Sequence, residues 1–149
     1  LGSIIEFHHK RSRQNLKLGY YDAKRMIYGL EGRIYYIEQT QEEWYYEKIL
    51  EGLSDIEKAE ISFVLRLSRK HSEAEFYLAM LEASAKLLRI PKYQIYTVQE
   101  LEQEVCEKYQ KRKDKINWSF LFFLPIHCTN FVKNIYCFGK FHTRTNRIA

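Results

Sequence analysis

Four short motifs fix where helices can begin in this chain. In each one, a Ser or Thr is followed three residues later by Glu, the pattern of a helix capping box. The hydroxyl accepts a hydrogen bond from the backbone amide of the Glu, and the carboxylate accepts one from the amide of the Ser or Thr. Apolar residues then recur at helical spacing, so we predict a helix at each motif. The motifs are Thr40-Gln41-Glu42-Glu43, Ser54-Asp55-Ile56-Glu57, Ser72-Glu73-Ala74-Glu75 and Thr97-Val98-Gln99-Glu100.

The apolar stripes of these helices predict which side chains enter the core. A fifth helix, which has no such motif, is predicted to begin at Asp22, and Pro91 disfavours helical backbone at Ile90. The stretch Lys92–Tyr96 has possible strand character, and we interpret it as an extended connector. The predicted stripes of the helices that begin at Asp22 and Ser54 comprise Met26, Ile27, Leu30, Ile34 and Ile37, and Ile56, Ala59, Phe63, Val64 and Leu67, respectively.

Few residues interrupt this helical pattern. The 149-residue chain has six Gly and two Pro, which leaves little room for the many turns of an all-β fold. Hydrophobic residues make up 46% of the chain and charged residues 29%, as is typical of one globular domain. We therefore predict an all-α fold, a bundle of about five mostly antiparallel helices over residues 22–114. A basic N-terminal arm (1–21) and an aromatic, basic C-terminal segment (115–149), docked or partly disordered, flank this bundle.

The net charge of +5 is unevenly distributed. Residues 1–21 carry four basic side chains and one acidic one, and residues 115–149 carry five basic and no acidic side chains. The intervening residues 22–114 carry fifteen basic and eighteen acidic side chains, so the body of the chain is mildly acidic. Basic ends of this kind favour contact with phosphates that does not depend on base sequence. The residues predicted to contact nucleic acid are Lys10, Arg11, Arg13, Lys17, Lys133, Lys140, Arg144 and Arg147.

Dense aromatic residues offer a second kind of contact. Trp44, Tyr45 and Tyr46 are adjacent, and aromatics at helical spacing form core or a partner interface more often than they stack on bases. We interpret these three as a surface for a protein partner or for a second copy of the chain. The run Trp118–Ile126 is too short to cross a bilayer, for which about 20 apolar residues are needed. We expect the segment that contains this run to dock on the bundle or on a partner, with a membrane surface as an alternative.

The cysteines favour a reducing compartment. Three Cys is an odd number, and their spacing suggests no disulfide framework. No secretory signal opens the chain, so we expect an intracellular protein, cytoplasmic or nuclear. The first residue is not Met, which suggests a fragment or a processed chain.

Metal and cofactor chemistry are not expected. The residue types that suit zinc gather near the C-terminus, but His127 and Cys128 are adjacent, and neighbouring residues rarely reach one tetrahedral ion. Cys137 and His142 complete that set without a usual ligand spacing. The chain has no glycine-rich phosphate loop and no nucleophile elbow, so we predict no cofactor and do not expect an enzyme.

One short pattern points to a different class. In Arg66-Leu67-Ser68-Arg69-Lys70-His71, an Arg precedes a His by five positions. This spacing resembles the active-site motif of the HEPN ribonucleases, small helical proteins that dimerise to bring two such motifs together. The resemblance implies that Arg66 would hold the scissile phosphate and that His71 would transfer protons. Leu67 stands where those enzymes often have a polar residue.

Three hypotheses follow for the function. The first is a small nucleic-acid-associated accessory or regulatory protein that contacts phosphates through its basic ends. The second is a helical protein-interaction module without enzymatic activity, which acts with a partner or as a homo-oligomer. The third is a HEPN-like ribonuclease that uses Arg66 and His71 as catalytic residues. The first two are favoured over the third.

Overall fold

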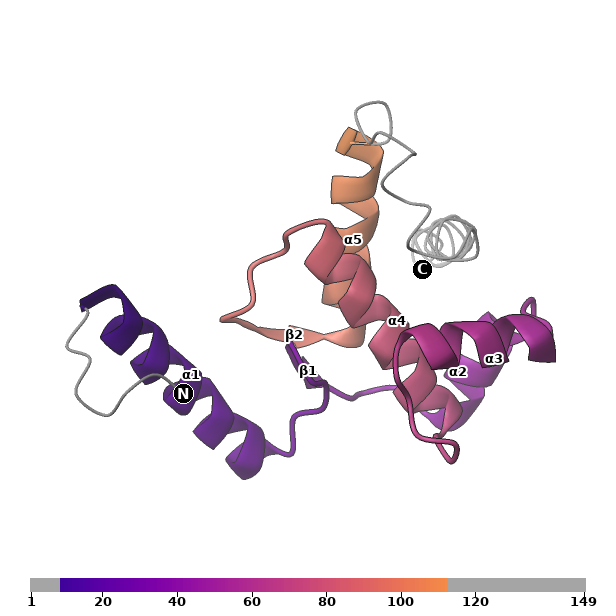
Figure 1. The fold of residues 1–149 in the computed structure, drawn as a ribbon, viewed down its shortest axis with the longest axis horizontal. Helices are drawn as coiled ribbons and strands as arrows, with labels where there is room; N and C mark the ends of the chain where they lie inside the picture. The colour runs from indigo at the N-terminus through magenta and orange to yellow at the C-terminus, as the bar shows by residue number, and fades with distance from the viewer. Residues whose placement is uncertain (1–8, 113–149) are drawn as a thin grey trace, which may run out of the picture.

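A computed structural model describes residues 9–112, and these residues are mostly helical (Figure 1). The predicted helical class is thus confirmed, with the addition of one small parallel sheet. Within the described range, no helix is long and apolar enough to cross a membrane. The elements are α1 (His9–Tyr28), β1 (Tyr36–Glu38), α2 (Glu43–Leu50), α3 (Asp55–Val64), α4 (Glu73–Leu87), β2 (Ile95–Thr97) and α5 (Val98–Arg112).

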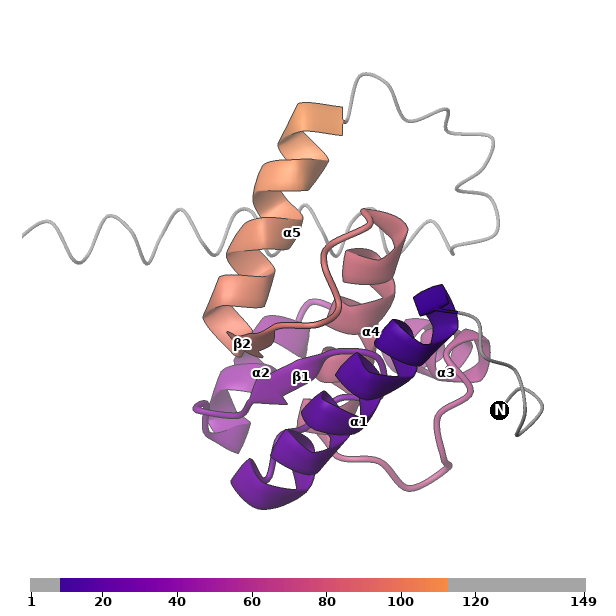
Figure 2. The ribbon, with the colours of Figure 1, turned by 90° about the vertical axis from the view of Figure 1, so that its left-hand side faces the viewer.

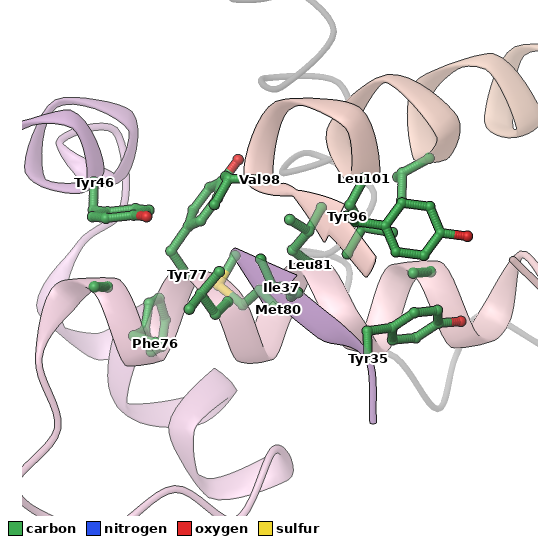
Figure 3. Packing of buried hydrophobic residues seen from close by; sticks show 14 of the residues in the cluster. Tyr35, Ile37, Tyr46, Phe76, Tyr77, Met80, Leu81, Tyr96, Val98 and Leu101 are labelled. Atoms are coloured by element: carbon green, nitrogen blue, oxygen red, sulfur yellow. The ribbon is translucent and has the colours of Figure 1, made fainter. Parts of the chain in front are cut away.

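Helix α4 lies at the centre of the core. Nine of its fifteen residues are buried, and both α2 and α5 pack against it. Aromatic rings supply much of the packing: Tyr46 of α2 lies 5.4 Å from Tyr77 of α4 between ring centroids. At the other end of the cluster, Tyr35 meets Tyr96 at 6.2 Å (Figure 3). The core therefore forms where α2, α4, α5 and the two strands converge.

The two strands were not predicted as a sheet. β1 and β2 pair in parallel, with Tyr36 opposite Ile95 and Glu38 opposite Thr97. The connector Lys92–Tyr96 does enter a strand, in line with the strand character of its sequence. Residues 36–38, however, were predicted to be helical, and that prediction is wrong.

Two glycines end the first helix earlier than predicted. Gly29 has a positive φ of 63°, and the amide of Leu30 donates to the carbonyl of Arg25 at 3.0 Å, a bond that closes the helix end. Gly32 follows with φ 92° and turns the chain toward β1. The helix thus runs over His9–Tyr28 instead of beginning at Asp22, so residues 9–21 of the predicted arm are helical.

Three of the four predicted capping boxes are confirmed. At Ser54 and Ser72 both reciprocal hydrogen bonds are present. At the start of α5, the amide of Thr97 donates to Glu100 Oε2 at 2.8 Å, and the amide of Glu100 donates to Thr97 Oγ1 at 3.2 Å. These bonds satisfy backbone donors that the first helical turn leaves without partners.

The fourth capping box, at Thr40, does not form. Helix α2 begins later, at Glu43, and its N-cap residue Glu42 makes no side-chain capping bond. Strand pairing continues to Glu38, opposite Thr97, so the chain is still extended just before Thr40. The sheet therefore displaces the predicted helix start.

Two predicted apolar stripes face outward in part, although Leu30 and Ile37 of the first stripe are buried. Met26 and Ile27 of α1 are 86% and 74% exposed, and Phe63 of α3 is 86% exposed. Ile61, which is not in the predicted stripe of α3, is the residue of that helix that enters the core. Helical spacing correctly predicted amphipathic helices here, but not the face that the protein buries.

Candidate functional site

Helix α1 is the element least integrated into the core. None of the residues of His9–Tyr28 is buried, and the helix contacts the body through its C-terminal half (Figures 1 and 2). The ring of Tyr21 lies 5.1 Å from that of Tyr36 and 6.0 Å from that of Tyr93. The N-terminal half, with residues 9–20 all exposed, is thus available to a partner.

Polar contacts complete this attachment. The hydroxyl of Tyr36 donates to Asp22 Oδ1 at 3.0 Å, and the Arg25 guanidinium lies 4.5 Å above the Tyr36 ring. Arg25 Nη2 also donates to the carbonyl of Tyr35 at 3.1 Å. Burial, assisted by the hydrogen bond to Asp22, raises the pKa of Tyr36 to about 12. Asp22, the only acidic residue of α1, is therefore engaged with β1 and leaves the remainder of the helix basic.

Four cations form a stripe along α1, which we call the basic stripe. At 3.6 residues per turn, positions 10, 13, 17 and 24 fall within about 60° of one another around the helix axis. The first three side chains are exposed, and the Nζ of Lys24 lies 4.8 Å from the centroid of the Tyr20 ring. Residues 9–21 contain no acidic side chain. The basic stripe consists of Lys10, Arg13, Lys17 and Lys24.

An apolar stripe runs beside the basic one. Leu16, Tyr20 and Ile27 are separated by four and seven positions, which places them within about 40° of one another on the helix. They are 73%, 56% and 74% exposed. Large apolar side chains grouped in this way on a surface mark contact sites more often than single exposed ones do.

Sequence reasoning included three of the basic-stripe residues but missed Lys24 and the whole apolar stripe. The reason was the predicted helix start at Asp22, which left residues 1–21 without a periodic structure. A signal was present, because Lys10, Lys17 and Lys24 recur every seven residues. Arg11, also predicted to contact phosphate, lies about 100° from Lys10 around α1 and is not part of the basic stripe.

Of the three residues of the predicted interaction surface on α2, one is exposed and two are buried. Trp44 is exposed, and its indole Nε1 donates to Glu42 Oε2 at 2.9 Å. Tyr45 and Tyr46 are buried in the core. Only the first of the three aromatic residues can therefore meet a partner in this structure.

The buried tyrosines surround a carboxylate. Glu102 of α5 accepts hydrogen bonds from the hydroxyls of Tyr45, at 3.1 Å, and of Tyr77. Burial raises the pKa of Glu102, although both hydrogen bonds act in the opposite direction. Nearby, the buried hydroxyl of Tyr46 has no hydrogen-bond partner among the described residues, and burial raises its pKa to about 12. This polar cluster lies inside the fold and joins α2, α4 and α5.

The structure places Arg66 and His71 in the connection between α3 and α4. Arg66 is exposed and has a left-handed backbone, with φ 53°. The His71 ring stacks on Phe76, with 5.6 Å between centroids, and its Nδ1 lies 2.8 Å from the carbonyl oxygen of Ser68. The other ring nitrogen, Nε2, lies 3.3 Å from Ser62 Oγ. Through these contacts, His71 fixes the loop between α3 and α4.

A buried carboxylate that sequence reasoning did not single out anchors the turn before β1. Glu82 of α4 is 3% exposed and accepts hydrogen bonds from the amides of Arg33, Ile34 and Tyr35 at 3.0, 2.8 and 2.7 Å. Three such bonds offset the cost of burying a charge. From sequence alone, Glu82 looks like a solvated residue of a helix.

Several predicted residues lie outside the described part of the chain. They include the C-terminal cations Lys133, Lys140, Arg144 and Arg147, and the residues considered as zinc ligands, His127, Cys128, Cys137 and His142. Within residues 9–112, no group of three or more potential metal ligands comes together.

Comparison with known proteins gives no relative for this chain. No family model, no curated protein and no solved structure matches it. The chemistry and placement of α1 are therefore the best guide to the function.

Proposed function

We propose that this protein associates with nucleic acid and contacts its phosphates through the basic stripe of α1. The observation that carries the proposal is the alignment of Lys10, Arg13, Lys17 and Lys24 on one side of a helix whose attachment to the body lies in its C-terminal half. The role is that of an accessory or regulatory protein rather than an enzyme.

The chemistry of the basic stripe favours contact with the backbone over reading of bases. Lys and Arg bind phosphate oxygens and release counterions, and this contribution to affinity is independent of sequence. The uncharged groups of this half of α1 that can read base edges, the hydroxyl of Ser12 and the amides of Gln14 and Asn15, are not part of the basic stripe. The C-terminal cations predicted from sequence would add contacts of the same kind.

The test is equilibrium binding of the full chain to a labelled duplex of arbitrary sequence. Fluorescence anisotropy measures the binding constant at several salt concentrations. The four contacts of the basic stripe predict a slope of log K against log salt of about −3.6, and contacts by the C-terminal cations would make it steeper. Over a fourfold rise in salt, this corresponds to a loss in affinity of about a hundredfold. An affinity that does not change with salt would rule out the proposal.

A matched pair of variants separates the basic stripe from net charge. The first replaces Lys10, Arg13 and Lys17 by Glu, and the second replaces the exposed Lys86, Lys92 and Lys111 by Glu, so both lower the charge by six. We expect the first variant to lose most of the affinity and most of the salt slope, and the second to retain both. Equal losses in the two variants would mean that only net charge matters.

A protein-interaction function is the second candidate, and one observation favours it. Large apolar side chains are exposed on two separate helices, on α1 at Leu16 and Ile27 and on α3 at Ile56 and Phe63. This observation identifies specific surfaces that a partner could cover.

A further inference from the structure

Helix α3 exposes an apolar face. Ile56, Ala59 and Phe63 fall within about 60° of one another around the helix axis, and Val64 borders them. All four are exposed, and Ala59, Phe63 and Val64 line a shallow depression together with Glu60. We call these four residues the α3 face. Like the apolar stripe of α1, it consists of exposed apolar residues at helical spacing.

The charges around these two surfaces are opposite. Helix α1 carries six basic side chains and one acidic one over His9–Tyr28. Residues 42–60, which include α2 and most of α3, carry seven acidic side chains and two basic ones. Glu47, Glu51 and Asp55 are among the exposed acidic residues of this region, which we call the acidic lobe. Glu60 lines the depression of the α3 face and Asp55 lies on the same helix, so the two apolar surfaces have neighbours of opposite charge, which favours their association.

The two surfaces lie far apart within one copy of the chain. Figure 1 shows α1 and α3 at opposite sides of the described structure, and Figure 2 shows α1 in front with α3 behind it. Because α1 is also tied to β1 through Tyr21, Asp22 and Arg25, it cannot reach the α3 face of its own copy in this structure. A second copy presents both surfaces to it.

We propose that α1 of one copy docks on the acidic lobe of a second copy. The apolar stripe of α1 covers the α3 face, and the neighbouring cations meet the acidic side chains of the lobe. If the exchange is reciprocal, two identical contacts close a symmetric dimer. This inference goes beyond the proposed nucleic-acid function and does not depend on it.

Contacts between like surfaces are less favourable. Pairing of two α1 helices along their apolar stripes would bring their basic stripes together, and pairing of two α3 faces would bring two acidic lobes together. Like charges at an interface oppose association. The charge pattern therefore favours contact of α1 with the α3 face over contact between two α1 helices or between two α3 faces.

Two variants of the full chain test the inference without changing its charge. In the first, Leu16 and Ile27 are replaced by Gln, and in the second, Ile56 and Phe63 are replaced by Gln, a good helix former. A matched control replaces Met26 and Leu87 by Gln, because both are exposed apolar residues that lie outside the two surfaces. Sedimentation velocity over a range of protein concentrations, in the absence of nucleic acid, reports the dimer dissociation constant.

We expect the unmodified chain and the control to form dimers with the same dissociation constant. Each of the two test variants should raise that constant by at least about tenfold, because central apolar residues dominate interface energies. Circular dichroism of each variant should be unchanged, since the replaced side chains are exposed.

Mixing the two variants gives the sharpest result. The α1 variant retains an intact α3 face, and the α3 variant retains an intact α1, so one of the two contacts re-forms in the mixture. We expect the mixture to associate more strongly than either variant alone. A chain that stays monomeric at all concentrations would overturn the inference, as would a loss confined to one variant, which indicates contact between like surfaces. The basic stripe is intact in both variants, so duplex binding by either one tests the proposed function separately.

Discussion

Helices α4 and α1 differ in almost every property that determines stability. Nine residues of α4 are buried, whereas none of α1 is, although α1 is the longer helix. Helix α4 contacts α2 and α5, and its Glu82 anchors the turn that leads into β1. Helix α1 touches the body through Tyr21, Asp22 and Arg25. One helix holds the fold together, and the other carries the charge and the apolar surface available to partners.

This difference shows that a long helix need not contribute buried side chains to the core. A helix that buries nothing gains little from tertiary packing, and its residues can change without loss of fold. The basic stripe of α1 is placed where substitutions affect binding rather than stability.

The largest effect is expected from a matched pair of substitutions in the two regions. Leu81→Ala in α4 removes a fully buried side chain and should lower the free energy of unfolding by about 2–5 kcal/mol. Ile27→Ala in α1 should change it by no more than about 0.5 kcal/mol, because Ile27 is exposed. Urea denaturation of the two variants measures both values. Similar losses at the two sites would contradict the comparison.

A second pair concerns the turn that Glu82 anchors. An added Cβ at Gly32 would lie 2.6 Å from Glu82 Oε1 and 2.7 Å from the carbonyl oxygen of Tyr35. Because Gly32 also has φ 92°, Gly32→Ala should cost about 2–3 kcal/mol of unfolding free energy. Gly29→Ala is the control, with a positive φ but open space around it, and it should cost about 1 kcal/mol. Equal losses of unfolding free energy in the two variants would mean that the positive φ alone, and not the close contacts at Gly32, sets the cost of the substitution.

Alkaline pH should destabilise the core through its tyrosines. Burial raises the pKa of Tyr35 and of Tyr46 to about 12, above the ordinary value near 10. Their stabilising contribution is fully present below pH 10 and is lost as the pH rises through about 12. Ultraviolet titration should show Tyr35 and Tyr46 ionising only well above pH 10, as the chain unfolds. Simultaneous titration of all tyrosines near pH 10 would contradict the buried positions.

A smaller pH effect is expected at Glu102. Burial raises its pKa, so its contribution to stability is greatest below the ordinary carboxyl pKa and declines as the pH rises through the raised value. In Glu102→Gln this decline should disappear, while Tyr45 and Tyr77 still donate to the amide oxygen. Unfolding free energies measured from acidic to neutral pH, with Glu104→Gln as an exposed control, report the difference. An identical pH dependence in both variants would contradict the assignment.

The helices could be predicted where local chemistry decides them. The capping boxes at Ser54, Ser72 and Thr97 satisfy their own first turns, so the sequence alone places the starts of α3, α4 and α5. The box at Thr40 fails because β1 pairs with a strand far away in the sequence. Strands of three residues are too short to show a period of two, so no local signal indicated the sheet.

The candidate site could be predicted only in part. Charge along the sequence indicated Lys10, Arg13 and Lys17, but their alignment required the helix that residues 9–21 form. Which apolar face stays exposed depends on how neighbouring helices are placed, so Ile27 and Phe63 were predicted to be buried. Tyr45 and Tyr46 show the converse, because α4 and α5 cover them and only Trp44 is left at the surface.

The separation of stability from binding can be measured on a single variant. In the chain with Lys10, Arg13 and Lys17 replaced by Glu, we predict an unfolding free energy within about 0.5 kcal/mol of the unmodified chain. In the same preparation, affinity for a labelled duplex at low salt should fall by at least about a hundredfold. A variant that binds the duplex as tightly as the unmodified chain, or one that loses its fold along with its binding, would contradict the account.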